Sequence, residues 1–291
     1  MQAVTQPRTR DEVQSETRTD LLTEWVRRHK GVLRIAVIGV GGITCSLLED
    51  LTRYLVYGLG PVGPLRQVRL VLADGDRFER RNVERQSFRE LLNKAEAKGK
   101  ELHSLFPVDA LKVGVVDRYV DNGNVAGVIT DGTITFLAVD NHRGRVTVMK
   151  HCGTLEDSVL ISGGNDLTTG DAQLQLRVGG RWLTPPILSY HPDILRGAHE
   201  DTRRDGHCDD ERALQQRPQV LFTNRSVATA MLDMFYALVS GWRQGVERPP
   251  FHEVFVDVMR CRMATSAAGA VPTRDRTINA NRRIEDALHK D

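Results

Sequence analysis

Glycine, acidic and basic residues between positions 34 and 85 have the types and the spacing needed to hold a nucleotide. A short apolar run at 34–38 leads into a glycine turn that spans Gly39 to Gly42. Such a turn between a strand and a helix lets backbone N–H groups approach a phosphate closely. A second apolar run, 68–73, ends at Asp74. An acidic residue at that strand end is well placed to bind a ribose hydroxyl.

A guanidinium follows the second apolar run and favours ATP over NAD. Arg85 lies in the segment Asn82-x-x-Arg85-Gln86, and its planar fork suits phosphate oxygens. A simple dinucleotide fold does not require such an arginine. Asp74 also lies about 33 residues beyond Gly41, whereas the dinucleotide pattern places its acidic residue about 20 residues on. An NAD-dependent oxidoreductase on a Rossmann domain is the less favoured alternative.

The elements that must position these residues alternate between strand and helix. Apolar runs predict strands and helices in βαβ order, with strands at 34–38, 68–73, around 113–120, 134–139 and 159–162, and helices after the glycine turn, at 94–106 and through Cys152. This order predicts an α/β fold: a Rossmann-like, mostly parallel sheet with helices on both faces. Residues 171–178 then alternate with period two, as in a half-exposed antiparallel strand, and 254–258 predict a last strand.

The remaining segments set the expected domain limits. Residues 1–19 are polar and predict a flexible arm, 20–260 one domain, and 261–291 a polar C-terminal tail. Residues 185–219 are rich in Pro, Arg, Asp and His and predict a long crossover loop. Asn224 is expected to cap the helix that follows this loop.

Composition narrows the class of protein. The 291 residues carry a formal charge of only +2, with basic and acidic residues interspersed, which argues against nucleic-acid binding. The longest apolar runs are too short to span a membrane, and the polar N-terminus predicts a cytoplasmic protein. The four cysteines have no paired spacing, so neither a disulfide framework nor a zinc site is expected.

The order of motifs resembles the ThiF/MoeB/HesA family, the ubiquitin-activating-enzyme-like adenylyltransferases. The resemblance covers roughly residues 34–180, with weaker support from the helix at 221–240 and the strand after it. It rests on the family motifs G-x-G-G-x-G, D-x-D, N-x-x-R-Q, D-N-x-x-x-R and S-G, matched by Gly39, Gly41, Gly42, Asp74, Asp76, Asn82, Arg85, Gln86, Asp140, Asn141, Arg145, Ser162 and Gly163. Thr44 replaces the last glycine of the first motif. Beyond residue 185 the chain is most similar to ThiF-like proteins of plasmid gene clusters.

The family's catalytic lysine has two candidates here. The family pattern G-x-x-K-A-E-A on a helix that ends near a proline is matched by Lys94, with Pro107 beyond it. The distance from Arg85 to Lys94 is shorter than the family norm. Lys98 has the family spacing but not the local sequence. Lys94 is preferred, and Lys98 is the alternative.

The resemblance implies a reaction in which ATP activates a carboxylate. Members attach AMP to the C-terminal glycine of a ubiquitin-like or sulfur-carrier protein and release pyrophosphate; a short peptide is a further possible substrate. By resemblance, Arg85 and Lys94 contact the phosphates, Asp140 binds Mg²⁺, Asp74 holds the ribose and Asn82 orients a phosphate. Each residue also has an ordinary explanation: a turn or cap for the aspartates, a surface ion pair for Arg85 and a solvated helix face for the lysines.

The resemblance also raises questions of partners and of a second step. Members usually work as homodimers, and an arginine from the neighbouring subunit would come here from Arg8, Arg10 or Arg18. Cys208, in the crossover loop, is a candidate for thioester formation, although a plain loop cysteine is the stronger interpretation because aspartates flank it. Cys152 is expected in the core, and Cys45 is expected to pack on its helix near the nucleotide. A catalytically silent module that binds a ubiquitin-like partner is the other alternative.

Overall fold

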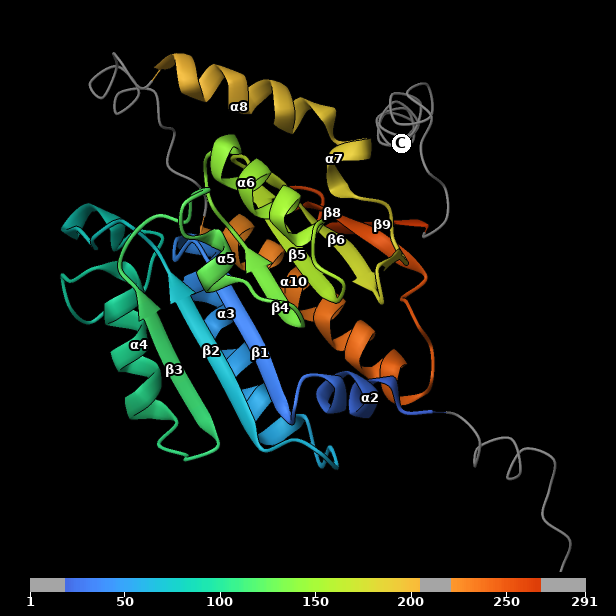
Figure 1. Cartoon of the computed structure of the whole chain (residues 1–291). Coiled ribbons are helices and arrows are strands. Elements are labelled where there is room, and N and C mark those ends of the chain that lie inside the picture. Colours follow the sequence, from blue (N-terminus) through green and yellow to red (C-terminus); the bar gives the residue numbers. More distant parts are fainter. Residues whose placement is uncertain (1–18, 205–220, 268–291) are drawn as a thin grey trace, which may run out of the picture.

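Nine strands form one mixed sheet in the computed structural model, which describes residues 19–204 and 221–267 (Figure 1). Five parallel strands lie in the order β3-β2-β1-β4-β5, and β6, β8 and β9 continue the sheet antiparallel, with β7 paired to β6. Their bounds are β1 Val32–Ile38, β2 Gln67–Ala73, β3 Leu111–Val116, β4 Thr133–Leu137, β5 Ser158–Asn165, β6 Thr169–Val178, β7 Arg181–Trp182, β8 Phe251–Asp257 and β9 Arg262–Ala267. The α/β fold class expected from the sequence is confirmed.

The strand order reverses between β1 and β4, which creates a switch point at the carboxyl ends of the strands. β1 pairs with β2 on one side and with β4 on the other, and Ile38 is level with both Ala73 and Leu137. The ends of these three strands therefore meet at one edge of the sheet. Open α/β sheets bind ligands at this edge, beside the point where the order reverses.

Helices cover both faces of the sheet and bury two separate apolar layers (Figure 1). Alternate residues of β1 supply both, with Ile35 and Val37 in one layer and Ala36 and Ile38 in the other. The first layer packs under α2 Leu21–Arg28, α3 Gly42–Arg53, α4 Lys94–Leu105 and α10 Leu221–Arg243, and the second under α5 Val125–Val128, α6 His142–Cys152, α7 Ile187–Tyr190 and α8 Pro192–Arg204. A π-helical turn η1, Tyr54–Gly58, and a 3-10 turn η2, Arg80–Asn82, complete the set. Each buried Val, Leu or Ile stabilises the fold by about 1.5–3 kcal/mol.

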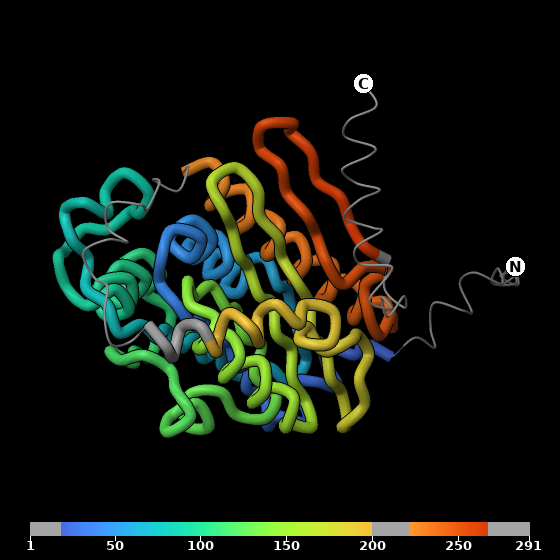
Figure 2. The backbone as a smooth tube through the Cα atoms, turned by 90° about the horizontal axis from the view of Figure 1, so that it is seen from above, coloured from blue at the N-terminus to red at the C-terminus, as the bar shows by residue number. Residues whose placement is uncertain are grey.

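The segment expected to be a long crossover loop is helical over most of its described part. Ile187, Tyr190 and Ile194 follow one another at helical spacing, and all three are buried in the second apolar layer. Pro192 begins α8, where its missing N–H costs nothing. Figure 2 shows the gold α8 running along α6 above the carboxyl edge. The burial of three apolar side chains therefore stabilises helices in a segment whose polar composition predicted a loop. Residues 205–220 lie outside the described part of the chain.

Three further expectations need correction. Asn224 does not cap α10, because the helix already begins at Leu221. Residues 262–267, expected in the polar tail, form β9 against β8. Two polar side chains of β6 are more deeply buried than expected for a half-exposed strand: Gln173 is 4% and Gln175 1% exposed, because α6 to α8 cover them. Gln175 is satisfied there, donating to the carbonyl of Met149 and accepting from the N–H of Ile187.

None of the helices within residues 19–204 and 221–267 combines the length and the apolar character that a bilayer crossing demands.

Candidate active site

The glycine turn presents the first turn of α3 at the switch point. Gly39 has φ +86°, and a side chain there would meet the carbonyl oxygen of Ala138 at 2.7 Å, so only glycine fits. Gly41 precedes α3 without a side-chain cap, and a Cβ at Gly41 would meet no protein atom within 4 Å. The N–H groups that begin a helix have no partner within it. This turn can therefore accept a phosphate.

Thr44 fills the place of the missing motif glycine without disturbing the turn. Its side chain is fully buried, and its hydroxyl donates to the carbonyl oxygen of Gly39 at 2.5 Å. The substitution thus fastens α3 to the turn that precedes it.

Asp74 connects the end of β2 to the glycine turn. One carboxylate oxygen accepts the N–H of Val40 at 2.5 Å, and the other accepts the N–H of Asp76 at 2.8 Å. Burial raises the pKa of Asp74, while these two N–H groups oppose the rise. Asp74 therefore organises the turn, which is its ordinary explanation. A contact with a ribose would use the remaining lone pairs of the same two carboxylate oxygens.

The start of α4 is fixed to the same strand end. The side-chain oxygen of Asn93 caps α4 by accepting the N–H of Glu96, and its amide nitrogen donates to the carbonyls of Asp74 (2.7 Å) and Asp76 (3.0 Å). Lys94 follows at once, and its ammonium donates to the carboxylate of Asp76 at 2.7 Å. The cap thereby delivers Lys94 to the carboxyl edge of the sheet.

The two candidate lysines have different surroundings. Lys98, one turn further along α4, donates to Glu101 at 2.7 Å and to Ser87 at 3.3 Å. Only Lys94 of the two is part of the network that includes Asp74 and Asp76. Burial raises the pKa of Asp76, but the hydrogen bonds from Lys94 and Tyr119 outweigh it and lower that pKa below its ordinary value. Asp76 is therefore charged at neutral pH.

Residues 82–86 lie near the glycine turn. Asn82 is buried, and its side-chain oxygen accepts the N–H of Glu79 at 2.8 Å. The carbonyl of Arg85 would lie 3.2 Å from a Cβ on Gly42. Within 19–204 and 221–267, the guanidinium of Arg85 has neither a hydrogen bond nor an ion pair, and the buried side-chain oxygen of Gln86 has no donor. Both groups are therefore available to a ligand.

After β4, the carboxylate of Asp140 has no partner among the described residues, whereas the guanidinium of Arg145 is held by hydrogen bonds. Asp140 is exposed and forms no hydrogen bond or ion pair with the described residues, and Asn141 caps α6 by accepting the N–H of Gly144 at 2.6 Å. Arg145 donates to the hydroxyl of Ser162 (2.9 Å) and to the carbonyl of Gly163 (2.8 Å). The D-N-x-x-x-R and S-G motifs are thus joined by direct contact.

Tyr119 links the β2 end to Asp140. Its hydroxyl donates to the carboxylate of Asp76. That hydrogen bond, burial, and the charges of Asp76, Asp74 and Asp140 together raise the pKa of Tyr119. Tyr119 is therefore near the carboxylates that follow β2 and β4, although nothing in the sequence around Tyr119 indicated it.

Comparison with known proteins identifies the family to which this chain belongs. A model of the ThiF family matches residues 26–244. This chain belongs to the ThiF family. No curated protein sequence matches it.

Solved structures show the same fold at low identity. Escherichia coli MccB crystallised with ATP is 14% identical, with a TM-score of 0.58 over 86% of this chain and 66% of the MccB chain. PaaA is 15% identical, with a TM-score of 0.59 over 91% and 86% of the two chains. The match to this ThiF-family chain thus spans a little under two thirds of the length of the E. coli MccB chain.

One buried residue near the ThiF-family glycine turn was missed by the sequence reasoning. Asn224 of α10 is 1% exposed, and neither atom of its carboxamide has a hydrogen-bond partner among the described residues. A Cβ on Gly42 would lie 2.2 Å from its amide nitrogen. Gly42 is therefore required for the close approach of α3 and α10. From the sequence, Asn224 resembled only a helix cap, and nothing there indicated that its side chain would be buried.

The cysteines differ in their reactivity. Burial raises the pKa of Cys45 to about 11 and that of Cys152 to about 12, so both thiols stay protonated, as expected for interior cysteines. Cys261 is exposed. Cys208, the thioester candidate, lies outside the described residues. A surface hollow of about 340 Å³ lies between α4 and β3 and is lined by none of the candidate site residues.

Proposed function

We propose that this ThiF-family protein uses ATP to adenylate the C-terminal carboxylate of a peptide or small carrier protein. The observation that carries the proposal is the ammonium of Lys94, held 2.7 Å from Asp76 beside a glycine turn at the switch point. The family supports it, as does the fold shared with MccB, which was crystallised with ATP and with MccA. A ubiquitin-like or sulfur-carrier protein and a short peptide are the substrate classes under this proposal.

The residues present fit ATP and Mg²⁺. The open side of Gly41 can admit a phosphate, and the guanidinium of Arg85 is available to a second one. Asp140 offers the oxygen ligand that Mg²⁺ prefers, since this ion binds few protein groups besides substrate phosphates. When bound, Mg²⁺ would offset phosphate charge during the transfer.

The reaction requires cations because two anions must meet. A carboxylate oxygen of the substrate forms a bond to the α-phosphorus, and the bond from that phosphorus to the bridging oxygen breaks, so that pyrophosphate leaves with the electron pair. Arg85 and Lys94 would stabilise the negative charge that develops on the phosphate oxygens. Asp76 holds the ammonium of Lys94 in position, and its lowered pKa keeps that partner charged.

ATP–pyrophosphate exchange tests the proposal. The purified full-length protein is assayed alone and with ubiquitin-like proteins and short peptides encoded near its gene. Arg85→Ala and Asp140→Ala are assayed beside the wild type, with Arg80→Ala as a matched control because Arg80 is an exposed arginine of the same turn. We expect exchange that depends on one partner and is lost in the first two variants only.

Two other results would replace the proposal. ATP binding without exchange, for any partner, would favour a silent module that binds a ubiquitin-like protein. NAD(H) binding without ATP binding would favour an oxidoreductase. A homodimer, an arginine from the neighbouring subunit (Arg8, Arg10 or Arg18) and a thioester on Cys208 remain proposals. Light scattering tests the first, and exchange by R8A, R10A and R18A variants tests the second. Thiol-sensitive capture of the partner tests the third.

A further inference from the structure

A cluster of side chains that could act as metal ligands lies on the antiparallel half of the sheet. Asp171 of β6, His191 between α7 and α8, and Glu253 of β8 each place one donor atom within 4.8 Å of the others. Nε2 of His191 lies 2.5 Å from a carboxylate oxygen of Glu253. The side chains of His191 and Glu253 are 17% and 7% exposed. Three elements distant in sequence therefore converge on one mostly buried point.

Neighbouring polar groups orient each member of this cluster. Gln173 donates to one oxygen of Asp171 at 2.8 Å, and Ser266 donates to one oxygen of Glu253 at 3.5 Å. The carboxylate of Asp193 lies 3.9 Å from Nδ1 of His191. Asp171 thus retains its second oxygen, and the second oxygen of Glu253 faces Nε2 of His191. A carboxylate behind a histidine, and amides or hydroxyls behind carboxylates, are the outer partners typical of metal ligands.

Among the described residues, the carboxylates of the cluster have only two cationic groups beside them: His191 faces Glu253, and Arg145 lies near Asp171. Asp171, Glu253 and Asp193 face His191, and Arg145 is the nearby cation that acts on Asp171. Arg145 already donates to Ser162 and Gly163. Carboxylates gathered in a buried place are unfavourable unless a cation joins them.

Two buried polar atoms beside the cluster also lack partners. The side-chain oxygen of Gln173 and the hydroxyl of Tyr190 have no hydrogen bond among the described residues, and both residues are 4% exposed. Gln173 contacts Asp171 and is paired with Glu253 across the strands. The ring centroids of Tyr190 and His191 are 4.8 Å apart, and the charges of Glu253 and Asp171 add to the burial that raises the pKa of Tyr190. Unsatisfied buried groups of this kind are typical of places that bind an ion or a water molecule.

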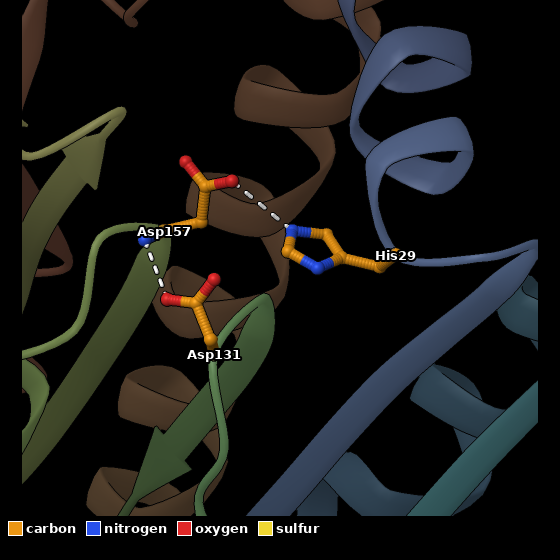
Figure 3. Close-up of side chains that lie close together, drawn as sticks. All are labelled: His29, Asp131 and Asp157. Atoms are coloured by element: carbon orange, nitrogen blue, oxygen red, sulfur yellow. Dashed lines mark hydrogen bonds and ion pairs between the residues drawn. The ribbon is translucent and has the colours of Figure 1, made fainter.

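A second His–Asp–Asp group at the opposite edge of the sheet shows the contrast (Figure 3). There Asp157 accepts from Arg28 at 2.8 Å and from the N–H of Gly179 at 2.8 Å, and lies 3.2 Å from His29. Asp131 accepts the N–H of Asp157 at 2.8 Å. Arginine and backbone donors already satisfy these carboxylates, so no cation is called for.

We propose that Asp171, His191 and Glu253 bind one zinc ion, which fastens the α7–α8 segment to β6 and β8. One imidazole and two carboxylates are accepted zinc ligands, and three protein ligands leave a fourth position for water. The expectation of no zinc rested on cysteine spacing, and this site uses no cysteine. The site is independent of the adenylation proposed above.

Metal analysis of the full-length protein tests the site. The protein is stripped with a chelator, dialysed against Zn²⁺ and measured for bound zinc, beside His191→Ala, Glu253→Gln and the matched control Asp157→Asn. We expect about one zinc per chain in the wild type and the control. His191→Ala and Glu253→Gln should each bind at least roughly tenfold more weakly. Zinc should raise the melting temperature of the wild type but not of these two variants.

Circular dichroism of each variant without zinc establishes that it is folded. Gln173→Leu serves as a milder variant that keeps all three ligands, and it should weaken zinc binding by roughly tenfold. Stoichiometric zinc that persists in both His191→Ala and Glu253→Gln would locate the metal elsewhere and overturn the proposal. Failure of the wild type to bind zinc would overturn it as well.

Discussion

The two halves of the sheet handle polar residues in opposite ways. In the parallel half, polar groups follow the strand ends, and Asp74, Asp76 and Lys94 bond to one another at the carboxyl edge. In the antiparallel half, a polar row crosses the strands themselves. Ser162, Gln173, Glu253 and Ser266 lie side by side on β5, β6, β8 and β9.

This difference separates two kinds of work. A strand end leaves its polar groups in reach of a ligand without interrupting the apolar layers, so the parallel half can hold a nucleotide at little cost to stability. A polar row buried under α6 to α8 costs free energy unless its groups are paired. The zinc ion proposed above would supply such pairing in the antiparallel half, and substitutions in the two halves should affect different measurements.

The largest expected effect comes from Lys94 in the parallel half. Lys94→Ala removes the one ammonium in the Asp74–Asp76 network, and we expect partner-dependent exchange to fall by roughly 10²–10³-fold. Lys98→Ala is the matched control on the same helix, because its ammonium is bonded to Glu101. ATP–pyrophosphate exchange measures both. A larger loss in Lys98→Ala would mean that the lysine with the family spacing acts, and would contradict the assignment made from geometry.

Gly39 and Gly41, two residues apart, should separate stability from ligand binding. Gly39→Ala forces a side chain into φ +86° and against Ala138, and should lower the free energy of unfolding by roughly 2–3 kcal/mol. Gly41→Ala places its methyl where it meets no protein atom. It should keep wild-type stability and weaken ATP binding by about tenfold or more, which is roughly 1.4 kcal/mol. Urea unfolding and calorimetric titration with ATP measure the two effects. Wild-type ATP affinity in Gly41→Ala would place the nucleotide elsewhere.

The parallel half was largely predictable, because its signals are local. Apolar runs ending in Gly39 and Asp74 set the strands within a few residues of their bounds, and the cap Asn93 begins α4 where the lysine motif indicated. The antiparallel half was not predictable in the same way. Gln173 alternates with apolar neighbours as an exposed residue would, and only the distant α6 to α8 bury it.

The same reasoning explains the other misses. Helices α7 and α8 depend on a few apolar contacts with α6, which a composition rich in Pro, Arg and Asp conceals. Asn224 resembles a cap in sequence, and its burial follows from the packing of α10 on Gly42. Side chains whose partners lie far away in the chain carry no local signal.

The joint between the halves should show a smaller, pH-dependent effect. Asp157 directly precedes β5, the last parallel strand, and holds α2 through Arg28 and His29. Burial raises the pKa of Asp157, but its hydrogen bonds from His29 and Gly179 and the charge of Arg28 outweigh burial, so the pKa is lowered below 3.8. The stability that this provides is fully present above pH ~4 and is lost as the pH falls through the folded-state pKa.

Asp157→Asn should therefore lower the free energy of unfolding at pH 7 by about 1–2 kcal/mol. It should also reduce the loss of stability between pH 4 and more acidic values, which urea unfolding at a series of pH values measures. Exchange activity should stay near that of the wild type, because Asp157 lies at the edge opposite the carboxyl ends. An unchanged acid dependence would mean that Asp157 is not the group that titrates there.

The smallest effect is expected from Cys45, although it lies one turn into α3 beside the proposed nucleotide. Burial raises its pKa to about 11, so at pH 8 roughly one molecule in a thousand carries the thiolate. Cys45→Ala should leave exchange within about twofold and should leave the overall rate of thiol alkylation unchanged. Thiol labelling followed by peptide mapping measures the second point. Rapid labelling of Cys45 would mean that the parallel half exposes a nucleophile of its own. Slow labelling of Cys45 would fit an adenylation reaction that relies on cations and positioned oxygens and on no thiol. Any thioester would then have to form on a cysteine outside this half of the sheet.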